Sequence, residues 1–302
     1  MTEPRAVAEG LGFSYRVGSP VLDGLSFSAG PGETLGLLGR NGSGKTTLLR
    51  LLAGLTEATT GHLETTPLPA VVFDRTPFQD SLSGSENLRL GLALRRHADR
   101  TASAARYVSA LDLDEDSHRP VGEYSLGMRR RLALAEALSC RSPLALLDEP
   151  TLGLDPSGRT VLTDLLSEAA EAGKTIIIAT NDAAFAELVC SRVLVLEGGR
   201  ALADDAPSRL ISDLEAPTII EVESSGVPPH GSPPEGLSVV AAEPGHLVVS
   251  ASSGARELPA LCAWLAGSGA EVQAIRVREP GLADVFHALT GRRLVPDEAE
   301  RP

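Results

Sequence analysis

The sequence predicts an α/β protein with a mostly parallel sheet, followed by a smaller α+β domain. From Leu35 onward, short apolar runs of strand length alternate with longer segments that have helical spacing. Polar residues directly follow several of these runs, at the strand ends where open α/β sheets bind ligands. After Glu215 the composition shifts to short alternating strands around a Pro/Ser/Gly-rich loop at 224–236. We therefore expect one domain over residues 1–215 and a second over residues 216–302.

A glycine-rich loop joins a predicted buried strand at 35–38 to a predicted helix at 46–55. The loop fits the pattern G-x-x-x-x-G-K-[ST], with the fixed positions at Gly39, Gly44, Lys45 and Thr46. Gly42 and Gly44 allow the tight turn that points N–H groups at phosphate oxygens, and the helix N-terminus adds positive charge. The ammonium of Lys45 suits the β- and γ-phosphates, and the hydroxyl of Thr46 suits Mg²⁺. The sequence therefore predicts a nucleoside triphosphate site.

Composition excludes several other classes of protein. The 302 residues include 40 acidic and 27 basic side chains, a formal net charge of −13, which argues against a nucleic-acid binder. Lys45 and Lys174 are the only lysines. The three cysteines form no metal-binding spacing and predict reduced thiols in the cytosol. No apolar run approaches the ~18 residues of a membrane-spanning helix, so a membrane role would need other chains to span the bilayer.

The N-terminal part reads as an antiparallel pair of strands, at 7–13 and 21–28, with a turn at 18–20. Tyr15 lies between these strands. Its ring suits stacking on an adenine, and a strand-edge aromatic residue without a ligand is an equally good interpretation at this point.

An α-helical insertion is expected at about 80–140, after a short strand at 71–73. The sequence Ser83 to Glu86 is typical of a helix start. Further helical segments are expected over residues 90–100, 102–111 and 129–138. Ser125 to Gly127 precede the last of these helices, where an N-terminus favours an anion.

Two carboxylates end the apolar strand predicted at 144–149. Asp148 suits Mg²⁺, directly or through water, and Glu149 suits polarisation of an attacking water. A helix at 156–172 and a buried strand at 175–180 follow, with Asn181 at the end of that strand. The sheet is then expected to continue with a strand at 192–196 and a hairpin turn at 197–200.

The second domain is expected to be small and mixed. Its predicted strands are 218–223, 246–251 and 271–277, its predicted helices are 256–266 and 281–290, and a frayed tail is expected at 292–302.

With these motifs in order, residues 5–215 resemble the ATP-binding subunit of ABC (ATP-binding cassette) transporters. The resemblance implies a P-loop NTPase cassette that binds ATP and Mg²⁺. It assigns ATP contacts to the adenine-stacking Tyr15, the phosphate loop, the signature segment and the aspartate of the D-loop 151–155: Tyr15, Gly39, Asn41, Gly42, Ser43, Gly44, Lys45, Thr46, Thr47, Ser125, Gly127 and Asp155. Asp148 matches the Walker B aspartate and Glu149 the catalytic glutamate. Residues 278–292 look like the ending of daunorubicin-resistance-type subunits.

Three positions depart from the family pattern. The signature, usually L-S-G-G-Q, reads Y-S-L-G-M here, a form similar to that of the branch that exports drugs, lipids or polysaccharides. The switch histidine is Asn181, which cannot carry a positive charge, so hydrolysis is expected to be slowed. Asp74 takes the place of the Q-loop glutamine, as a further catalytic residue and Mg²⁺ ligand beside Thr46 and Asp148, with Gln79 as the competing candidate.

The resemblance implies an ATPase that powers export through a separate integral membrane permease. Two cassettes, expected to be a homodimer, would enclose two ATP molecules, each between the Walker motifs of one chain and the Ser125 to Gly127 segment of the other. The chain would then be cytoplasmic, on the inner face of the membrane. An ATP-binding module with little turnover is the first alternative, motivated by Asn181. A soluble cassette ATPase of DNA repair or translation is the second, disfavoured by the acidic charge and the single cassette.

Overall fold

The computed structural model describes residues 3–294 except 17, 67, 74–76, 96–100, 226–231, 253 and 268–270. These residues group into two units, one formed by residues up to Pro207 together with 289–294, and one formed by Ser208–Ala288. The boundary predicted from sequence, between residues 215 and 216, lies close to the first division. It stays a prediction for the extent of the functional domains.

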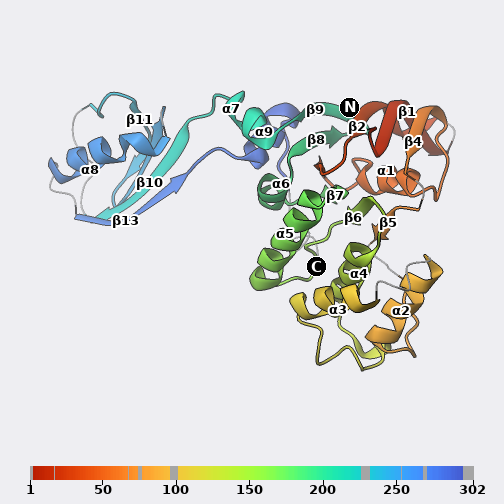
Figure 1. The fold of residues 1–302 in the computed structure, drawn as a ribbon. Helices are drawn as coiled ribbons and strands as arrows, with labels where there is room; N and C mark the ends of the chain where they lie inside the picture. Colours follow the sequence, from red (N-terminus) through yellow and green to blue (C-terminus); the bar gives the residue numbers. More distant parts are fainter. Residues whose placement is uncertain are drawn as a thin grey trace. The chain divides into compact units, whose positions relative to one another are not determined.

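A six-stranded sheet is the centre of the first unit (Figure 1), and its strand order is β5-β6-β7-β3-β8-β9. The strands are β5 Ala70–Val72, β6 Leu144–Asp148, β7 Thr175–Thr180, β3 Thr34–Leu38, β8 Arg192–Glu197 and β9 Arg200–Asp205. All neighbours are parallel except β8 and β9, which form the hairpin expected at 197–200. Every residue of β3, β6 and β7 is buried, because helices cover both faces of such a sheet. The predicted α/β fold class is confirmed.

A second, antiparallel sheet of order β2-β1-β4 covers helix α1. Its strands are β1 Ala6–Arg16, β2 Ser19–Ala29 and β4 Thr60–Thr65, and α1 is Lys45–Leu52. Leucines of α1, such as Leu48 and Leu52, share one core with Leu11 and Leu25 of this sheet and with Leu37 of the central sheet. Helix α1 is thus packed between two sheets, which fixes the loop at its N-terminus.

The opposite face of the central sheet contacts α5 Pro156–Glu171 and α6 Ala183–Val189. Gly36 of β3 points to this side, where an added Cβ would lie 2.8 Å from Sγ of Cys190, which caps α6. Burial raises the pKa of that thiol to about 12. The central sheet is therefore covered on both faces, as its apolar strands require.

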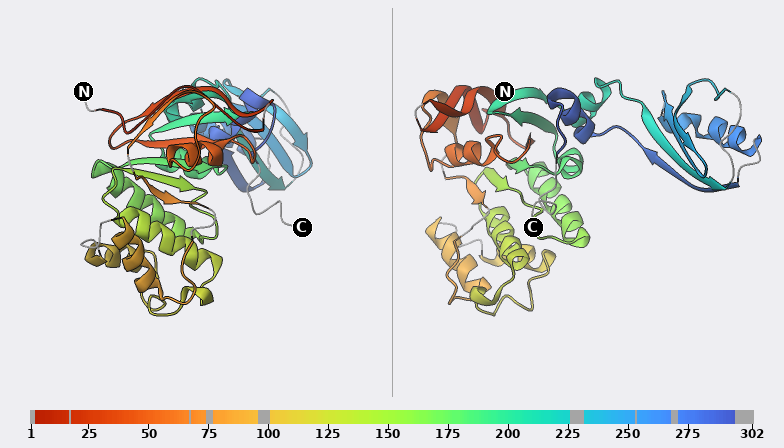
Figure 2. Two further views of the ribbon diagram at one scale, coloured as in Figure 1. Left: turned by 90° about the vertical axis from the view of Figure 1, so that its right-hand side faces the viewer. Right: turned by 180° about the vertical axis from the view of Figure 1, so that it is seen from behind.

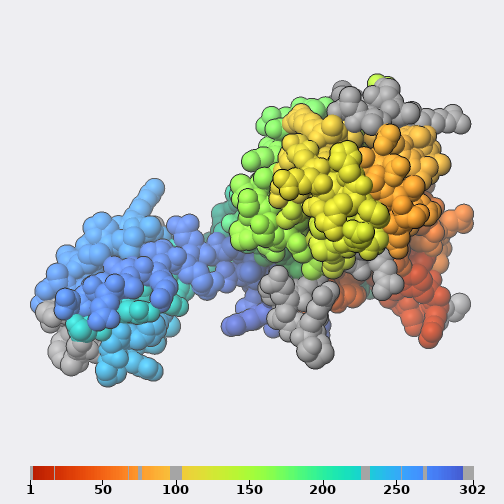
Figure 3. Space-filling view, turned by 90° about the horizontal axis from the view of Figure 1, so that it is seen from below, coloured from red at the N-terminus to blue at the C-terminus, as the bar shows by residue number. Residues whose placement is uncertain are grey.

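The helical insertion contains α2 Gly84–Leu94, α3 Thr101–Ala110, the 3-10 turn Val121–Glu123 and α4 Leu126–Ser139. Figure 2 shows these helices at the end of the cassette away from the antiparallel sheet, and in Figure 3 their atoms, orange to yellow, form one continuous surface. The helix start predicted at Ser83 to Glu86 is confirmed, because these two residues form a capping box at the start of α2. The separate helical segment predicted at 90–100 was wrong, since residues 90–94 belong to α2, which ends at Leu94. The start predicted at 129 for the last helix was also wrong. Helix α4 starts at Leu126, because the side chain of Ser125 caps it.

The second unit is a four-stranded antiparallel sheet, order β11-β12-β10-β13, with helix α8 packed on one face. Its elements, with the two helices at its ends, are α7 Pro207–Ser212, β10 Thr218–Ser225, β11 Leu237–Glu243, β12 His246–Ala251, α8 Leu258–Gly267, β13 Glu271–Arg278 and α9 Leu282–Thr290. Leu261 and Leu265 of α8 pack on Ile220, Val222 and Val249 of the sheet. Strand β11 was missed from sequence because only its first residue is buried, so its pattern does not alternate. Among the described residues, no helix is long and apolar enough to span a membrane.

Candidate functional site

The phosphate loop lies between the end of β3 and the start of α1. Gly42 and Gly44 have φ values of 82° and 105°, in the left-handed region that glycine adopts without strain. A Cβ on Gly44 would lie 2.7 Å from Cδ2 of Leu22, so this position admits glycine alone. Asn41 and Gly42 are exposed at the tip of the loop, whereas the Ser43 hydroxyl is buried and has no hydrogen-bond partner in the described part of the chain. The open glycine turn and this polar atom fit a loop that accepts phosphate oxygens.

Lys45 extends back along the loop from the first residue of α1. Its Nζ donates to the carbonyl oxygens of Gly39, at 2.6 Å, and Arg40, at 3.2 Å. It also lies 3.7 Å from Oε1 of Glu149, and the lysine is almost fully buried. A buried ammonium in this position supplies a fixed positive charge inside the loop.

The strand ends bring two carboxylates to this charge. Asp148 ends β6, and its Oδ2 accepts a hydrogen bond of 2.9 Å from the Thr46 hydroxyl. Glu149 follows with a φ of 43°, an unusual value for a residue other than glycine, and its N–H donates to the Ala179 carbonyl of β7. Backbone strain of this kind is concentrated at functional sites, and here it turns the Glu149 side chain toward Lys45.

The oxygen pair of Thr46 and Asp148 fits Mg²⁺, because this ion prefers carboxylate and hydroxyl oxygens and keeps several waters or phosphate oxygens. Within the described residues, no group of three or more His, Cys, Asp or Glu side chains is placed to hold a metal ion. A partial oxygen site of this kind matches an ion that arrives with a nucleotide.

Strand β7 ends beside the Glu149 carboxylate. Oε2 of Glu149 accepts from the Thr180 hydroxyl at 3.0 Å and lies 3.4 Å from the N–H of Asn181. Asn181 is buried, which puts its amide in the polar layer at the strand ends. Sequence reasoning missed Thr180, although a threonine that ends a buried apolar strand next to the site was a usable signal.

Tyr15 lies at the end of β1, next to the first turns of α1. Its hydroxyl is 3.3 Å from Oγ1 of Thr47 and accepts from Nη1 of Arg50 at 3.4 Å. These contacts, the Thr47 hydroxyl first, lower the pKa of Tyr15 although partial burial acts in the opposite direction. Phe13 meets the ring edge-on, and the residue is 57% exposed. An exposed ring held at its hydroxyl end can stack on a planar ligand.

The signature segment contacts its own helix and the D-loop, and part of it is exposed. The Ser125 hydroxyl accepts from the N–H of Met128 at 3.2 Å, and Leu126 is 49% exposed. A Cβ on Gly127 would lie 2.6 Å from the carbonyl oxygen of Gly153, so the segment abuts the D-loop. Among the described residues, the hydrogen bonds of Ser125 go to Met128 and Arg129 of its own helix. The phosphate loop is thus not its partner within one chain.

The D-loop, residues 151–155, connects the end of β6 to α5. Asp155 caps α5 by accepting from the N–H of Gly158 at 3.0 Å, and Nη2 of Arg131 lies 3.4 Å from the same carboxylate. Arg131 was not singled out from the sequence. Its position one turn beyond Met128 was the available signal.

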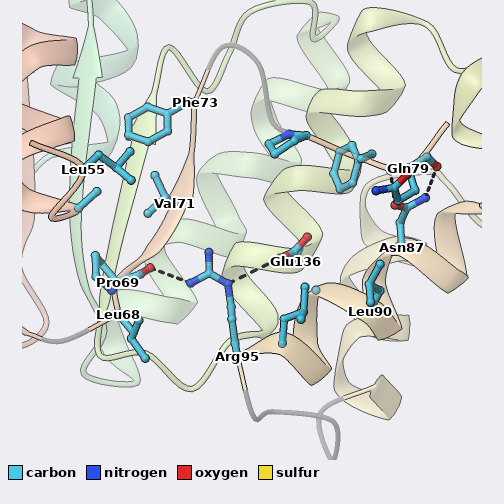
Figure 4. Close-up of a pocket in the computed structure, with 15 residues that line it drawn as sticks. Leu55, Leu68, Pro69, Val71, Phe73, Gln79, Asn87, Leu90, Arg95 and Glu136 are labelled. Carbon is cyan, nitrogen blue, oxygen red and sulfur yellow. Dashed lines mark hydrogen bonds and ion pairs between the residues drawn. The ribbon is translucent and has the colours of Figure 1, made fainter.

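The two candidates for the Q-loop position have different outcomes. Asp74 lies outside the described residues. Gln79 is described, and its backbone is fixed by the buried Asn87, whose Oδ1 accepts from the Gln79 N–H at 2.9 Å and whose Nδ2 donates to the Gln79 carbonyl at 3.0 Å. Gln79 lines a groove of about 670 Å³ between β5 and helices α2 and α4 (Figure 4). Neither residue is thereby placed at the nucleotide site.

The sequence is similar to known nucleotide-binding subunits. Residues 22–152 match the family model described as "ABC transporter". The chain is 33% identical over 305 residues to the fluoroquinolones export ATP-binding protein of Mycobacterium tuberculosis (strain CDC 1551 / Oshkosh), with 94% of this chain and 93% of that protein covered. It is 34% identical over 296 residues to the Nod factor export ATP-binding protein I of Rhizobium meliloti, with 91% and 85% covered.

The fold is also similar to solved structures. An ATP-binding subunit of an ABC transporter superimposes with a TM-score of 0.63 at 23% identity, with 69% of this chain and 92% of that chain covered. The cbiO1 protein of Clostridium perfringens, described as part of the ABC transporter complex cbiONQ, gives a TM-score of 0.59 at 25% identity, with 70% and 92% covered. These structures have the P-loop cassette fold, which confirms the fold predicted for the first unit.

Proposed function

This chain belongs to the ATP-binding subunits of ABC transporters, and from that premise we propose that it binds and hydrolyses Mg-ATP to power export through a separate membrane subunit. One observation carries the proposal. The ends of β3, β6 and β7 bring Lys45, Thr46, Asp148 and Glu149 together, with the Thr46 hydroxyl 2.9 Å from Asp148 and Lys45 3.7 Å from Glu149. Few reactions other than transfer of a metal-bound phosphoryl group need this combination.

The site residues then have separate roles. The N–H groups of residues 39–47 and the Lys45 ammonium hold the β- and γ-phosphates, and Tyr15 stacks on the adenine. Thr46 and Asp148 hold Mg²⁺, which neutralises phosphate charge when bound. Glu149 orients a water for attack on the γ-phosphorus and accepts its proton, and Asn181 donates a hydrogen bond at the γ-phosphate.

A second copy of the chain completes the site in this proposal. Ser125 and Leu126 are exposed, and in the described part of the chain Ser125 bonds only within its own helix, so Ser125 and Gly127 are available to meet the phosphates bound by a partner chain. Asp155 lies next to this segment, through Arg131. ATP then stabilises the closed dimer, and hydrolysis shifts the population toward the open one.

The permease is proposed to dock in the groove beside Gln79 (Figure 4). This groove lies between β5 and the helical insertion, so a helix seated there would move when the insertion moves. Such a partner would place the chain in the cytoplasm, on the inner face of the membrane. The relatives are named for export of fluoroquinolones and of Nod factor, which supports a drug-like or a lipid or polysaccharide substrate.

The second unit corresponds to the accessory domain of daunorubicin-resistance-type subunits in this proposal, on the resemblance of residues 278–292. Arg278 pairs with Asp284 in that segment, with Nη1 3.0 Å from Oδ1, which ties the start of α9 to β13. We assign this unit a role in stabilising the cassette dimer or restraining hydrolysis.

A module with little turnover is the second candidate, and Asn181 is the observation that favours it. The buried amide lies where the family has a histidine, and it cannot supply a positive charge at the γ-phosphate. Loss of one electrostatic contact of this kind can cost ~10²-fold in rate. Such a chain would gate a partner or form the slow half of a mixed dimer.

The deciding experiment is steady-state turnover of Mg-ATP by the purified chain, with Glu149→Gln as its control. Turnover that falls to background in Glu149→Gln while ATP binding persists supports the ATPase. Tight binding of Mg-ATP without turnover in the unmodified chain supports the second candidate. Failure to bind Mg-ATP at millimolar concentration would overturn both.

A further inference from the structure

Glu136 is the only carboxylate among the described residues that line the groove beside Gln79. We propose that Glu136 is the specificity-determining residue of this groove and that it receives a cationic side chain from an apolar helix of the membrane partner. The inference rests on the proposed docking of that partner in the groove.

The rim of the groove is unusually apolar for an exposed surface. Four of its leucines are largely accessible: Leu55 at 66%, Leu68 at 77%, Leu90 at 40% and Leu94 at 77%. Exposed apolar side chains gathered around one groove are typical of interaction sites. Leu68 also has a φ of 53°, a strained value for this residue, which keeps its side chain at the rim (Figure 4). An amphipathic helix with its leucine-like face turned inward fits such a surface.

Glu136 brings a negative charge to this groove, next to the polar lining residues Arg95, Asn87 and Gln79. Its side chain is only 16% exposed, and its Oε1 lies 3.7 Å from Nε of Arg95, beyond hydrogen-bond distance. Arg95 donates instead to the Pro69 carbonyl, at 2.9 Å. Among the described residues, the Glu136 carboxylate accepts no hydrogen bond, although buried carboxylates normally accept several. The groove therefore offers a carboxylate that has an ion pair with Arg95 but accepts no hydrogen bond within the described part of the chain.

Helix α2 has a glycine, Gly91, where it packs against the Glu136 carboxylate. A Cβ on Gly91 would lie 2.5 Å from Oε1 and 2.6 Å from Cδ of Glu136, so the carboxylate occupies the space of a side chain at that position. Glycine in a helix interior lowers helix stability relative to alanine. A glycine inside a helix and a largely buried carboxylate are each unfavourable, and here they occur at the same contact.

The charge state of the groove favours a cation over a neutral donor. Burial raises the pKa of Glu136, and the attraction of Arg95 offsets only part of that effect. A cationic side chain that enters the groove would lower this pKa again, which means that it binds the ionised form. Charge complementarity of this kind selects among partners more than it adds affinity.

Three labelled helical peptides of about 12 residues test the inference, each with leucines at i, i+3, i+4 and i+7. They differ at one central position, which is lysine, norleucine or glutamate. Fluorescence anisotropy with the full chain gives their dissociation constants. We expect the lysine peptide to bind about tenfold tighter than the norleucine peptide, and the glutamate peptide to bind weakest.

Variants separate recognition from a structural role. Glu136→Gln should bind the norleucine peptide as before and lose the preference for lysine, whereas Arg95→Gln should enlarge that preference. Glu168→Gln is the matched control, because it breaks the exposed ion pair of Arg106 and Glu168 outside the groove. It should leave all three affinities unchanged.

Four outcomes overturn the inference. The first three are equal affinities for the three peptides, a lysine preference that survives in Glu136→Gln, and a failure of all three peptides to bind. The fourth is self-association of the chain that Leu94→Asp abolishes. That result would assign the groove to a second copy of the chain. Equal affinities would leave docking itself intact. Unchanged turnover of Mg-ATP in Glu136→Gln would show that the ATPase proposal stands independently.

Discussion

The phosphate loop and the signature segment are both N-terminal ends of helices, and they differ in how completely their own chain surrounds them. The loop lies under the antiparallel sheet, with Lys45 and Asp148 buried and bonded to neighbours before any ligand arrives. The signature segment carries an exposed leucine, Leu126, and its serine bonds only within its own helix among the described residues. The helix start at the phosphate loop is thus surrounded by its own chain, whereas the helix start at the signature segment is exposed.

This difference indicates which parts of the proposed reaction each chain supplies. A buried, prearranged network lowers the cost of organising charge around phosphate. An exposed helix start has its dipole available but has no ligand of its own. Variants of the loop should therefore impair nucleotide binding by one chain, and variants of the signature segment should impair only what two chains do together.

The largest effect is expected at the loop, from Lys45→Ala. Removal of the buried ammonium should weaken ATP binding on the order of 10²-fold, because it takes away a desolvated charge partner of the phosphates. Lys174→Ala is the matched control, since Nζ of Lys174 also bonds two backbone carbonyls, Cys140 at 2.7 Å and Ser142 at 3.0 Å. Calorimetric titration with Mg-ATP measures both. Equal losses in the two variants would contradict a phosphate role for Lys45.

A smaller effect, confined to turnover, is expected at the signature segment from Gly127→Ala. The new methyl group would lie 2.6 Å from the Gly153 carbonyl, so the start of α4 must move. We expect turnover to fall about tenfold or more, since small displacements of positioning groups are costly, while ATP affinity of the dilute chain stays unchanged. Gly267→Ala is the control, because an added Cβ there meets no atom of the described residues within 4 Å. A matching loss of ATP affinity in Gly127→Ala would remove the distinction between the two helix starts.

The sequence specified the loop far better than the groove. The loop has a fixed pattern because backbone turns, charge and hydroxyl must follow at set intervals, so Gly39, Gly44, Lys45 and Thr46 could be picked out from the sequence alone. The strand ends were predictable for the same reason. The contacts of Glu149 with Thr180 and of Arg131 with Asp155 were not, because they join segments that only the fold brings together. Glu136 was missed because one acidic residue in an amphipathic helix looks like surface.

At the switch position, Asn181, a substitution is expected to increase turnover instead of lowering it. Asn181→His should raise turnover about tenfold, since a histidine can place a positive charge near the γ-phosphate. Affinity for ATP should change little. Single-turnover kinetics beside the steady-state rate would locate the gain in the chemical step. An unchanged rate would show that Asn181 does not limit hydrolysis.

The smallest effect is expected on stability, at Glu136. Burial raises the pKa of Glu136 in the folded chain above its value in the unfolded chain, which is about 4.3. Above that pH the folded chain therefore holds more protons than the unfolded chain, and its stability falls as pH rises. The ionised Glu136 carboxylate thus lowers the free energy of unfolding. Arg95 is the charged side chain set against it in the described structure. Glu136→Gln should therefore melt higher than the unmodified chain at pH 7, and this advantage should vanish below pH ~4. A lower melting temperature at pH 7 would mean that the ion pair with Arg95 outweighs the cost of burial.

The division of the chain into units has a consequence for how it can be dissected. The first unit includes residues on both sides of the second, and the ion pair of Arg292 with Glu197, at 2.9 Å, lies within it. The second unit is therefore an insertion held by two covalent connections. A truncated gene that stops after residue 215 would also delete Arg292. An internal excision that splices residue 207 to residue 289 removes the insertion alone, and a foreign domain whose ends lie close together can be grafted at the same junction.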